Sequence, residues 1–314
     1  MLKRFQNIKN VDYAIRLFNN KALRWGIGVT TLLGLLISNV SALAQPYEKS
    51  TLSNKNIHFD AVSIENQSIH FAASGNPEKP GVLFIHGTPG GWDAFEGYLA
   101  SAQLRQDFFL ISVDRPGWGK SPLDPKKIDG NFELQAKAIK AVLDHYPGKK
   151  WTIIGHSLGA SIAPKVALYA PDSVDSILLL AGSLNPKLGK PRWYNWAAST
   201  WAIASLIGDS MKYSNREIMG LRKQLKIMDA EIKTSKLDTD ILIMQGMKDK
   251  LVSPKNPAYV AQQWRDSFSS IELIELSDEG HFLPWRQAPL VVQSIYKLRA
   301  LQSQQASSLN TPTN

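Results

Sequence analysis

One stretch decides how the chain is expected to fold: Trp151-Thr152-Ile153-Ile154-Gly155-His156-Ser157-Leu158-Gly159-Ala160. Its apolar, β-rich beginning predicts a strand that ends at Gly155, and the residues after it favour a helix. Ser157 lies at the turn between them, in the G-x-S-x-G pattern of a nucleophile elbow. Such a turn strains the serine backbone and leaves no room for side chains at Gly155 and Gly159. We therefore expect the Ser157 hydroxyl to stand clear of the turn, with the Leu158 N–H directed toward whatever the serine attacks.

Continuous apolar runs alternate with helical stretches, such as 132–145, along the middle and the end of the chain. Runs of this kind are typical of strands buried on both faces of a parallel sheet that helices cover on both sides. The runs are 82–85, 108–113, 151–154, 176–180, 241–244 and 271–276. The sequence therefore predicts an α/β fold, in which active residues gather at the carboxyl ends of the strands.

Two earlier segments, 57–62 and 68–72, alternate apolar and polar residues. This alternation predicts an antiparallel pair of strands at one edge of the sheet, which brings the expected total to eight strands in a mostly parallel sheet. We interpret the histidines of these strands, His58 and His70, as solvent-facing residues.

The bulk composition is that of an ordinary globular protein, with 44% apolar and 20% charged residues among 314. The net charge of +9 is concentrated near the start, because residues 1–44 hold six basic residues against the single acidic Asp12. The remainder has no dense basic cluster, so a nucleic acid partner is not expected. Cysteine is absent, which excludes disulfides, thiolate metal sites and cysteine nucleophiles.

The N-terminal segment resembles an export signal. A basic region ends at Arg24, an uncharged apolar run covers 26–37, and Ala42 and Ala44 form an A-x-A cleavage pattern. We predict a signal peptide over 1–44 and export, to a bacterial periplasm. The long basic leader leaves open an uncleaved anchor. The apolar run is shorter than the roughly 20 residues of a membrane span, so we expect no stable membrane insertion once the signal is cleaved.

The segment 185–238 is rich in tryptophan and contains no obvious strand, so the alternation of strands and helices is interrupted there. An insertion of this size after a strand predicts a helical cap over the carboxyl edge of the sheet. The α/β core would then consist of 45–184 and 239–302, and the small polar residues of 303–314 predict a disordered tail. Aromatic residues in such a cap more often pack against one another than contact a ligand.

The glycine-rich segment 86–91 follows the strand at 82–85. A glycine-rich turn of this kind exposes backbone N–H groups. The Thr88 N–H is the natural partner of the Leu158 N–H in an oxyanion hole, where one donor can be worth about 3–4 kcal/mol of barrier. We interpret His86 as a structural residue that orders this turn.

Two further residues follow later strands, Asp249 after 241–244 and His281 after 271–276. His281 is expected to act as general base and then acid for Ser157, with Asp249 orienting it and stabilising its cation. A lone aspartate in a loop is more often a turn former, so the assignment depends on all three residues together. Their order along the chain is Ser, Asp, His.

These segments together resemble the α/β-hydrolase family over about 57–301. The matching segments are His86-Gly87-Thr88-Pro89-Gly90, Asp114-Arg115-Pro116-Gly117-Trp118-Gly119-Lys120-Ser121, Gly155-His156-Ser157-Leu158-Gly159, Gly246-Met247-Lys248-Asp249 and Gly280-His281-Phe282. The resemblance implies an acyl-transfer enzyme without cofactor or metal, in which Asp114 ties down its loop. Dehalogenases and epoxide hydrolases of this fold use aspartate at the elbow, so the serine disfavours their chemistry.

We therefore predict a serine hydrolase that cleaves a carboxylic ester, or a related amide, thioester or lactone. An acyltransferase or cofactor-free perhydrolase would use the same triad, and a non-catalytic binding protein is a further alternative. The substrate is expected to be a small, apolar acyl compound. Its pocket is predicted to be lined by Trp92, Trp118 and Trp193.

Overall fold

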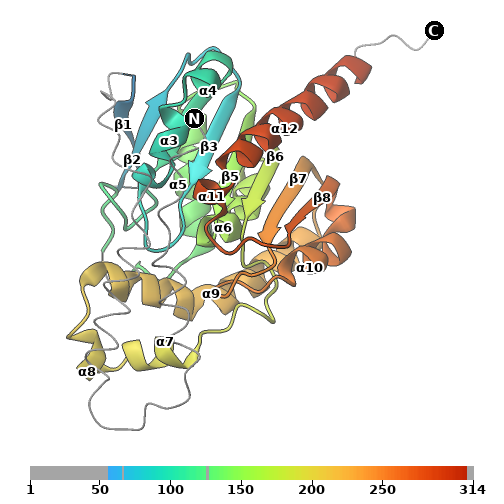
Figure 1. Cartoon of the computed structure of the whole chain (residues 1–314). Helices are drawn as coiled ribbons and strands as arrows, with labels where there is room; N and C mark the ends of the chain where they lie inside the picture. The colour runs from blue at the N-terminus through green and yellow to red at the C-terminus, as the bar shows by residue number, and fades with distance from the viewer. Residues whose placement is uncertain (1–55, 66, 125–126, 310–314) are drawn as a thin grey trace, which may run out of the picture. The chain divides into compact units, whose positions relative to one another are not determined.

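A computed structural model describes residues 56–65, 67–124 and 127–309 (Figure 1). All described residues lie in one compact unit of the chain, Lys49–Asn314. The predicted signal peptide or anchor, 1–44, lies outside the described residues. None of the described helices combines the length and apolar character that a membrane crossing needs.

An eight-stranded sheet forms the centre of the described unit, with the strand order β1-β2-β4-β3-β5-β6-β7-β8. Both contacts of β2, with β1 and with β4, are antiparallel, and every other neighbouring pair is parallel. The strands are β1 (His58–Ile64), β2 (Gln67–Ser74), β3 (Gly81–Ile85), β4 (Phe109–Val113), β5 (Trp151–His156), β6 (Val174–Leu180), β7 (Leu237–Gly246) and β8 (Phe268–Leu276). The predicted mostly parallel sheet with an antiparallel edge is confirmed.

Alternate residues of the central strands enter two separate hydrophobic clusters, one on each face of the sheet. In β3, Leu83 and Ile85 belong to one cluster, whereas Val82 and Phe84 belong to the other. Because side chains alternate across a strand, continuous apolar runs are needed to fill both clusters.

Helices cover both faces, as Figure 1 shows. The cluster of Leu83 includes residues of α5 (Phe132–Asp144), α6 (Leu158–Tyr169), α9 (Asp209–Lys233) and α10 (Asn256–Gln263). The cluster of Val82 includes residues of α3 (Glu96–Leu99), α11 (Leu283–Arg286) and α12 (Ala288–Leu309). It also includes other residues of the connection between β3 and β4, to which α3 belongs. That connection also holds the short helices η1 (Trp92–Phe95) and α4 (Ala102–Asp107), and η3 (Arg265–Ser267) precedes β8.

The connection between β6 and β7 is fully described and consists of loops and three helices, α7 (Trp193–Ala198), α8 (Trp201–Ala204) and α9. The last half of α9 carries the stripe Leu221, Leu225, Met228 and Ile232, which enters the core cluster. Residues at this spacing share one face of a helix. The insertion is thus fastened to the sheet layer by α9, while α7 packs on α9.

Two predictions about local structure are wrong. His70 is buried rather than solvent-facing, because β2 lies between β1 and β4, and its Nδ1 lies 2.8 Å from Asp114 Oδ2. His58, on the edge strand, is exposed as predicted. The tail is helical as far as Leu309, since α12 continues through the start of the segment 303–314. Ser303, Gln304, Gln305 and Ala306 are compatible with a helix that is already propagating.

Close packing of α6 on β3 depends on Gly159. A Cβ at this position would lie 2.1 Å from the carbonyl oxygen of Ile85. We expect Gly159→Ala to lower the free energy of unfolding by about 3 kcal/mol, because the clash is with backbone. Gly97→Ala is the matched control, since nothing lies within 4 Å of its added methyl. Urea unfolding measures both; equal midpoints for the two variants would contradict the packing argument.

Candidate active site

The turn between β5 and α6 holds Ser157 in a strained backbone conformation, with φ 54° and ψ −116°. Such a conformation is rare for a residue with a side chain and costs of order 1–3 kcal/mol. It is stabilised by the Ser157 N–H, which donates to the Leu180 carbonyl at 2.9 Å. A Cβ on Gly155 would lie 2.4 Å from the Gly159 carbonyl oxygen, and a Cβ on Gly159 would lie 2.1 Å from that of Ile85. Neither position therefore has room for a side chain. The predicted elbow geometry is present.

Asp249 and His281 lie in the loops after β7 and β8 and are hydrogen-bonded to each other. His281 Nδ1 is 2.8 Å from Asp249 Oδ2. The other oxygen of Asp249 accepts the N–H groups of Leu251 and Val252. Burial alone raises the pKa of Asp249, but the hydrogen bonds from His281 and from these amides outweigh it and hold the pKa below its usual value. The aspartate is therefore a carboxylate at neutral pH.

His156 places the His281 loop beside the elbow. Its Nε2 lies 3.0 Å from the His281 carbonyl oxygen, and the two rings are 4.9 Å apart between centroids. A carbonyl oxygen only accepts, so the Nε2 atom of His156 carries the proton. Burial, with a smaller contribution from His281, lowers the pKa of His156 to about 3. A neutral histidine directly before Ser157 thus holds the loop that carries His281.

The Ser157 hydroxyl makes no hydrogen bond to another described residue. Its backbone carbonyl accepts from the Ser161 side chain in the first turn of α6. The structure thus joins Asp249 to His281 and ties the loop that carries His281 to the elbow through His156. Hydrogen bonds to a nucleophile often form only when substrate is present.

The loop after β3 approaches the elbow from the other side. A Cβ on Gly87 would lie 3.0 Å from the Ser157 Cβ. The Gly87 carbonyl accepts two hydrogen bonds, from His86 Nδ1 at 2.7 Å and from Arg115 Nη2 at 2.8 Å. In a planar trans peptide the C=O and N–H point in opposite directions. The Thr88 N–H, which shares the peptide unit, therefore points away from Arg115.

Arg115 connects this loop to the helical insertion. Its side chain forms a bidentate ion pair with Glu217 of α9, with distances of 2.7 and 3.1 Å, and both side chains are completely buried. Arg115 Nε also donates to the His86 carbonyl, and the Arg115 N–H donates to His86 Nε2. His86 is therefore a neutral ring with its proton on Nδ1. Burial and the neighbouring guanidinium keep its pKa well below the usual range.

The three tryptophans predicted to line a substrate pocket lie in different environments. Trp118 is buried, and its indole N–H donates to Glu217 Oε1 at 3.3 Å. Trp92 is half-buried and its ring packs against the exposed Phe59. Trp193 is almost fully exposed on α7. The structure does not bring the three together. The ring of Trp118 lies 6.2 Å from that of His86 in the loop after β3.

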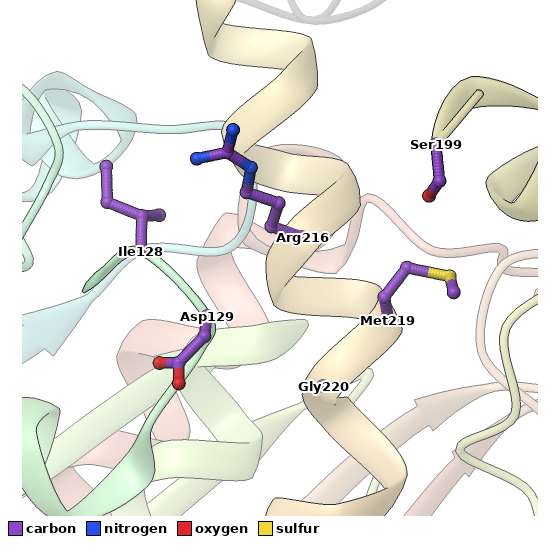
Figure 2. A pocket seen from close by; sticks show the side chains of 6 residues that line it. All are labelled: Ile128, Asp129, Ser199, Arg216, Met219 and Gly220. Atoms are coloured by element: carbon purple, nitrogen blue, oxygen red, sulfur yellow. The ribbon is translucent and has the colours of Figure 1, made fainter. Parts of the chain in front are cut away.

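A separate pocket of about 510 Å³ is lined by Arg216, Met219 and Gly220 of α9, by Ile128 and Asp129 of the loop before α5, and by Ser199. In Figure 2, Arg216 points to the side of α9 where Ile128 lies, and Met219 points to the side of Ser199. No predicted site residue lines this cavity. We therefore do not assign the substrate site to it, because the candidate catalytic side chains lie elsewhere.

Sequence reasoning missed three residues that organise the site: His156, Arg115 and Glu217. Arg115 lies in a segment quoted for the family resemblance, and His156 is the variable residue of the elbow motif. Glu217 carries no local signal, because it lies 102 residues from Arg115 in a helix with many charged residues. Asp114 fulfils its predicted role, accepting the Trp92 and Lys120 N–H groups across its loop.

Comparisons with known proteins agree with this architecture. Residues 80–201 match a family described as alpha/beta hydrolase fold. Among solved structures, Cfl2 from Burkholderia cenocepacia superposes with a TM-score of 0.62 at 14% identity, covering 80% of this chain and 99% of that one. At this level of identity the likeness establishes the fold alone.

Two curated relatives match part of the chain. The chain is 32% identical over 120 residues to a 2-hydroxy-6-oxononadienedioate/2-hydroxy-6-oxononatrienedioate hydrolase from Pseudomonas sp, which is 37% of this chain and 41% of the relative. It is 31% identical over 116 residues to a pimeloyl-[acyl-carrier protein] methyl ester esterase from Nitrosomonas europaea, which is 37% of this chain and 42% of the relative. The chain thus spans about two fifths of the length of each.

The buried neutral histidine before the elbow makes stability depend on pH. Unfolded His156 binds a proton below about pH 6.5, whereas the folded residue does so only below about 3. The unfolded state therefore holds more protons between these values, and stability rises with pH through that window. We expect His156→Gln, which keeps an N–H donor, to reduce the slope between pH 4 and 6 by about 1 kcal/mol per pH unit.

Urea unfolding at a series of pH values measures this slope. The exposed His58 provides the control, and His58→Gln should leave the slope unchanged. A slope for His156→Gln equal to that of the unaltered protein would contradict the assignment of a neutral, buried ring.

Proposed function

We propose that this chain, which belongs to the α/β-hydrolase superfamily, is a serine hydrolase that cleaves carboxylic esters of apolar acyl compounds. One observation carries the proposal. His281, which is hydrogen-bonded to Asp249, lies in a loop that His156 ties to the strained elbow of Ser157. In this proposal a nucleophile, a general base and a group that orients the base come from the ends of three strands, as acyl transfer requires.

In the proposed reaction the Ser157 oxygen attacks the acyl carbonyl while His281 Nε2 takes the hydroxyl proton. The His281 ring then carries a positive charge, which the ionised Asp249 stabilises at 2.8 Å. Collapse of the tetrahedral intermediate transfers that proton to the leaving alcohol and leaves an acyl-enzyme. A water molecule, deprotonated by His281, then attacks the acyl-enzyme, releases the acid and restores Ser157.

The Thr88 and Leu158 amides are proposed to hold the oxyanion. Leu158 is the first residue of α6, where the N–H groups have no acceptor within the helix. The Thr88 N–H points away from Arg115, because two donors fix the carbonyl of the same peptide unit. Preorganised donors of this kind need no reorientation as charge develops, which is why they are effective.

Ester cleavage is preferred over other reactions of the fold for two reasons. The elbow presents a hydroxyl, Ser157, rather than the carboxylate that epoxide opening uses in this fold. The matched relative from Nitrosomonas europaea is named as a methyl ester esterase. An acyltransferase or perhydrolase would form the same acyl-enzyme and differ in the acceptor, so added alcohol or peroxide separates them. Export to the periplasm remains part of the proposal.

Replacing the nucleophile tests the proposal directly. We expect Ser157→Ala to lower kcat for a short-chain aryl ester by about a thousandfold or more, since acyl-enzyme formation needs the hydroxyl. A fluorophosphonate should label the unaltered protein and not the variant. The exposed Ser210 provides the control, and Ser210→Ala should keep full activity. Ester turnover that survives Ser157→Ala would overturn the mechanism.

The Arg115–Glu217 pair should affect the rate through the Gly87–Thr88 peptide. Glu217→Gln removes the charge that compensates Arg115, and breaking a buried pair of this type costs about 3–5 kcal/mol of stability. The double variant Arg115→Met/Glu217→Met replaces the pair by apolar groups and should recover much of that loss. It lacks the Arg115 donor to the Gly87 carbonyl and keeps only that of His86, so we expect kcat to fall about tenfold with KM little changed.

Rates are normalised to the active sites that the fluorophosphonate labels, which removes the contribution of unfolded protein. Glu231→Gln provides the control, because Glu231 lies on the same helix and pairs with Lys165 away from the loop after β3. An unchanged kcat in the folded double variant would refute the positioning role of Arg115.

A further inference from the structure

The helices α7 and α8 expose large apolar side chains. Trp193 is 80% exposed, Trp196 61%, Trp201 86% and Leu206 69%. We call these four residues the tryptophan face. Scattered apolar residues are normal on a protein surface, but a group of three exposed tryptophans on two short, contacting helices marks an interaction site.

The way α7 is attached to α9 explains why its tryptophans are exposed. Asn195 donates to Asn215 Oδ1 at 3.0 Å, and Asn215 donates back to the Asn195 carbonyl and to the Ser199 hydroxyl. Asn195 and Ser199 are four residues apart and share the side of α7 that meets α9. Trp193 and Trp196, which are three residues apart, lie on a different side of α7 from the one that meets α9. In Figure 1, α9 lies between α7 and the sheet, so this side is turned away from the core.

The segment that carries the tryptophan face holds basic residues only, and the acidic residue that follows it, Asp209, pairs with Lys212. The segment 185–208 contains no aspartate or glutamate, and its basic residues Lys187, Lys190 and Arg192 are all exposed. Arg192 donates to the Leu251 carbonyl at 3.2 Å, which places the start of α7 beside the exposed Leu251. The basic residue before α7 thus contacts the loop that follows Asp249.

We propose that the tryptophan face docks on a lipid bilayer that contains anionic phospholipids. Tryptophan favours the boundary between headgroups and acyl chains, because its ring is apolar and its N–H needs a polar partner. Basic residues beside it are attracted to anionic headgroups. A surface that combines both binds in the plane of the interface without spanning the bilayer.

The charge argues against a second copy of the chain as the occupant. A twofold dimer would place the same patch on both subunits, and the three cations of each would face those of the other. Like charges held together in this way oppose association. Anionic headgroups instead complement them. The inference does not depend on the proposed ester hydrolysis, because docking involves no catalytic side chain.

Binding of the full chain to vesicles tests the proposal. Because the N-terminal segment is itself apolar and contains Trp25, every protein compared carries Trp25→Phe. The vesicles contain equal parts of phosphatidylglycerol and phosphatidylcholine, with bromine atoms on the acyl chains that quench nearby tryptophans. We expect quenching of the parent protein and its loss, with an unchanged thermal midpoint, in Trp193→Ser/Trp196→Ser/Trp201→Ser.

Two further comparisons isolate the parts of the interaction. Lys187→Gln and Lys190→Gln should each weaken binding about fivefold, and only to vesicles that contain phosphatidylglycerol. Leu273→Ser, at an exposed apolar residue of β8, is the matched control and should bind like the parent. Ser157→Ala should also bind like the parent, so loss of turnover and loss of docking are separate results.

Several outcomes would overturn the proposal. One is a parent protein whose tryptophans are not quenched, and another is a triple variant that is quenched as strongly as the parent. A third is a dimer that forms without vesicles and disappears in the triple variant, which would assign the face to a second copy of the chain.

Discussion

The arrangement of the site depends on one buried ion pair, between Arg115 after β4 and Glu217 in α9. Removing both groups from water is costly, and the pair persists because the guanidinium is fully engaged with two carboxylate oxygens and two backbone carbonyls. The same contacts fix the Gly87 carbonyl and therefore the direction of the Thr88 N–H. A single side chain thus couples the helical insertion to the loop that faces the elbow.

A second set of buried polar contacts fixes the opposite side of the elbow. His156 donates to the His281 carbonyl, and the Asp249 carboxylate accepts from the His281 ring and from two amides of its own loop. Each of these groups would be expensive to bury without a partner. Because nearly every polar atom is paired, the loops after β7 and β8 have few alternative arrangements. Such a network provides rigidity where a proton relay needs it.

The two surfaces of the insertion have different roles. The side of α9 that carries Leu221 and Leu225 belongs to the hydrophobic core, and its buried Glu217 reaches the loop after β3. By contrast, α7 is attached through polar groups such as Asn195 and keeps its tryptophans outside. Trp193, which the sequence suggested as a pocket wall, is therefore available for contacts with another surface.

Local patterns were sufficient for the strands and the elbow, because alternation, glycine positions and the G-x-S-x-G motif act through neighbouring residues. His70 could not be placed in this way, since its burial results from β4 pairing beside β2. The helix through Ser303 was likewise missed, because a small polar composition does not reveal that α12 is already formed when it reaches this residue.

The sequence by itself determined the order of the strands along the chain, the strained serine between two obligatory glycines, and the residue types suited to a triad. Only the tertiary structure decided that Asp249 pairs with His281, that Arg115 pairs with Glu217, and which tryptophans are buried. The physical reason is distance along the chain. Local rules govern backbone conformation, whereas partners separated by 32 and 102 positions meet only when the sheet and its helices are assembled.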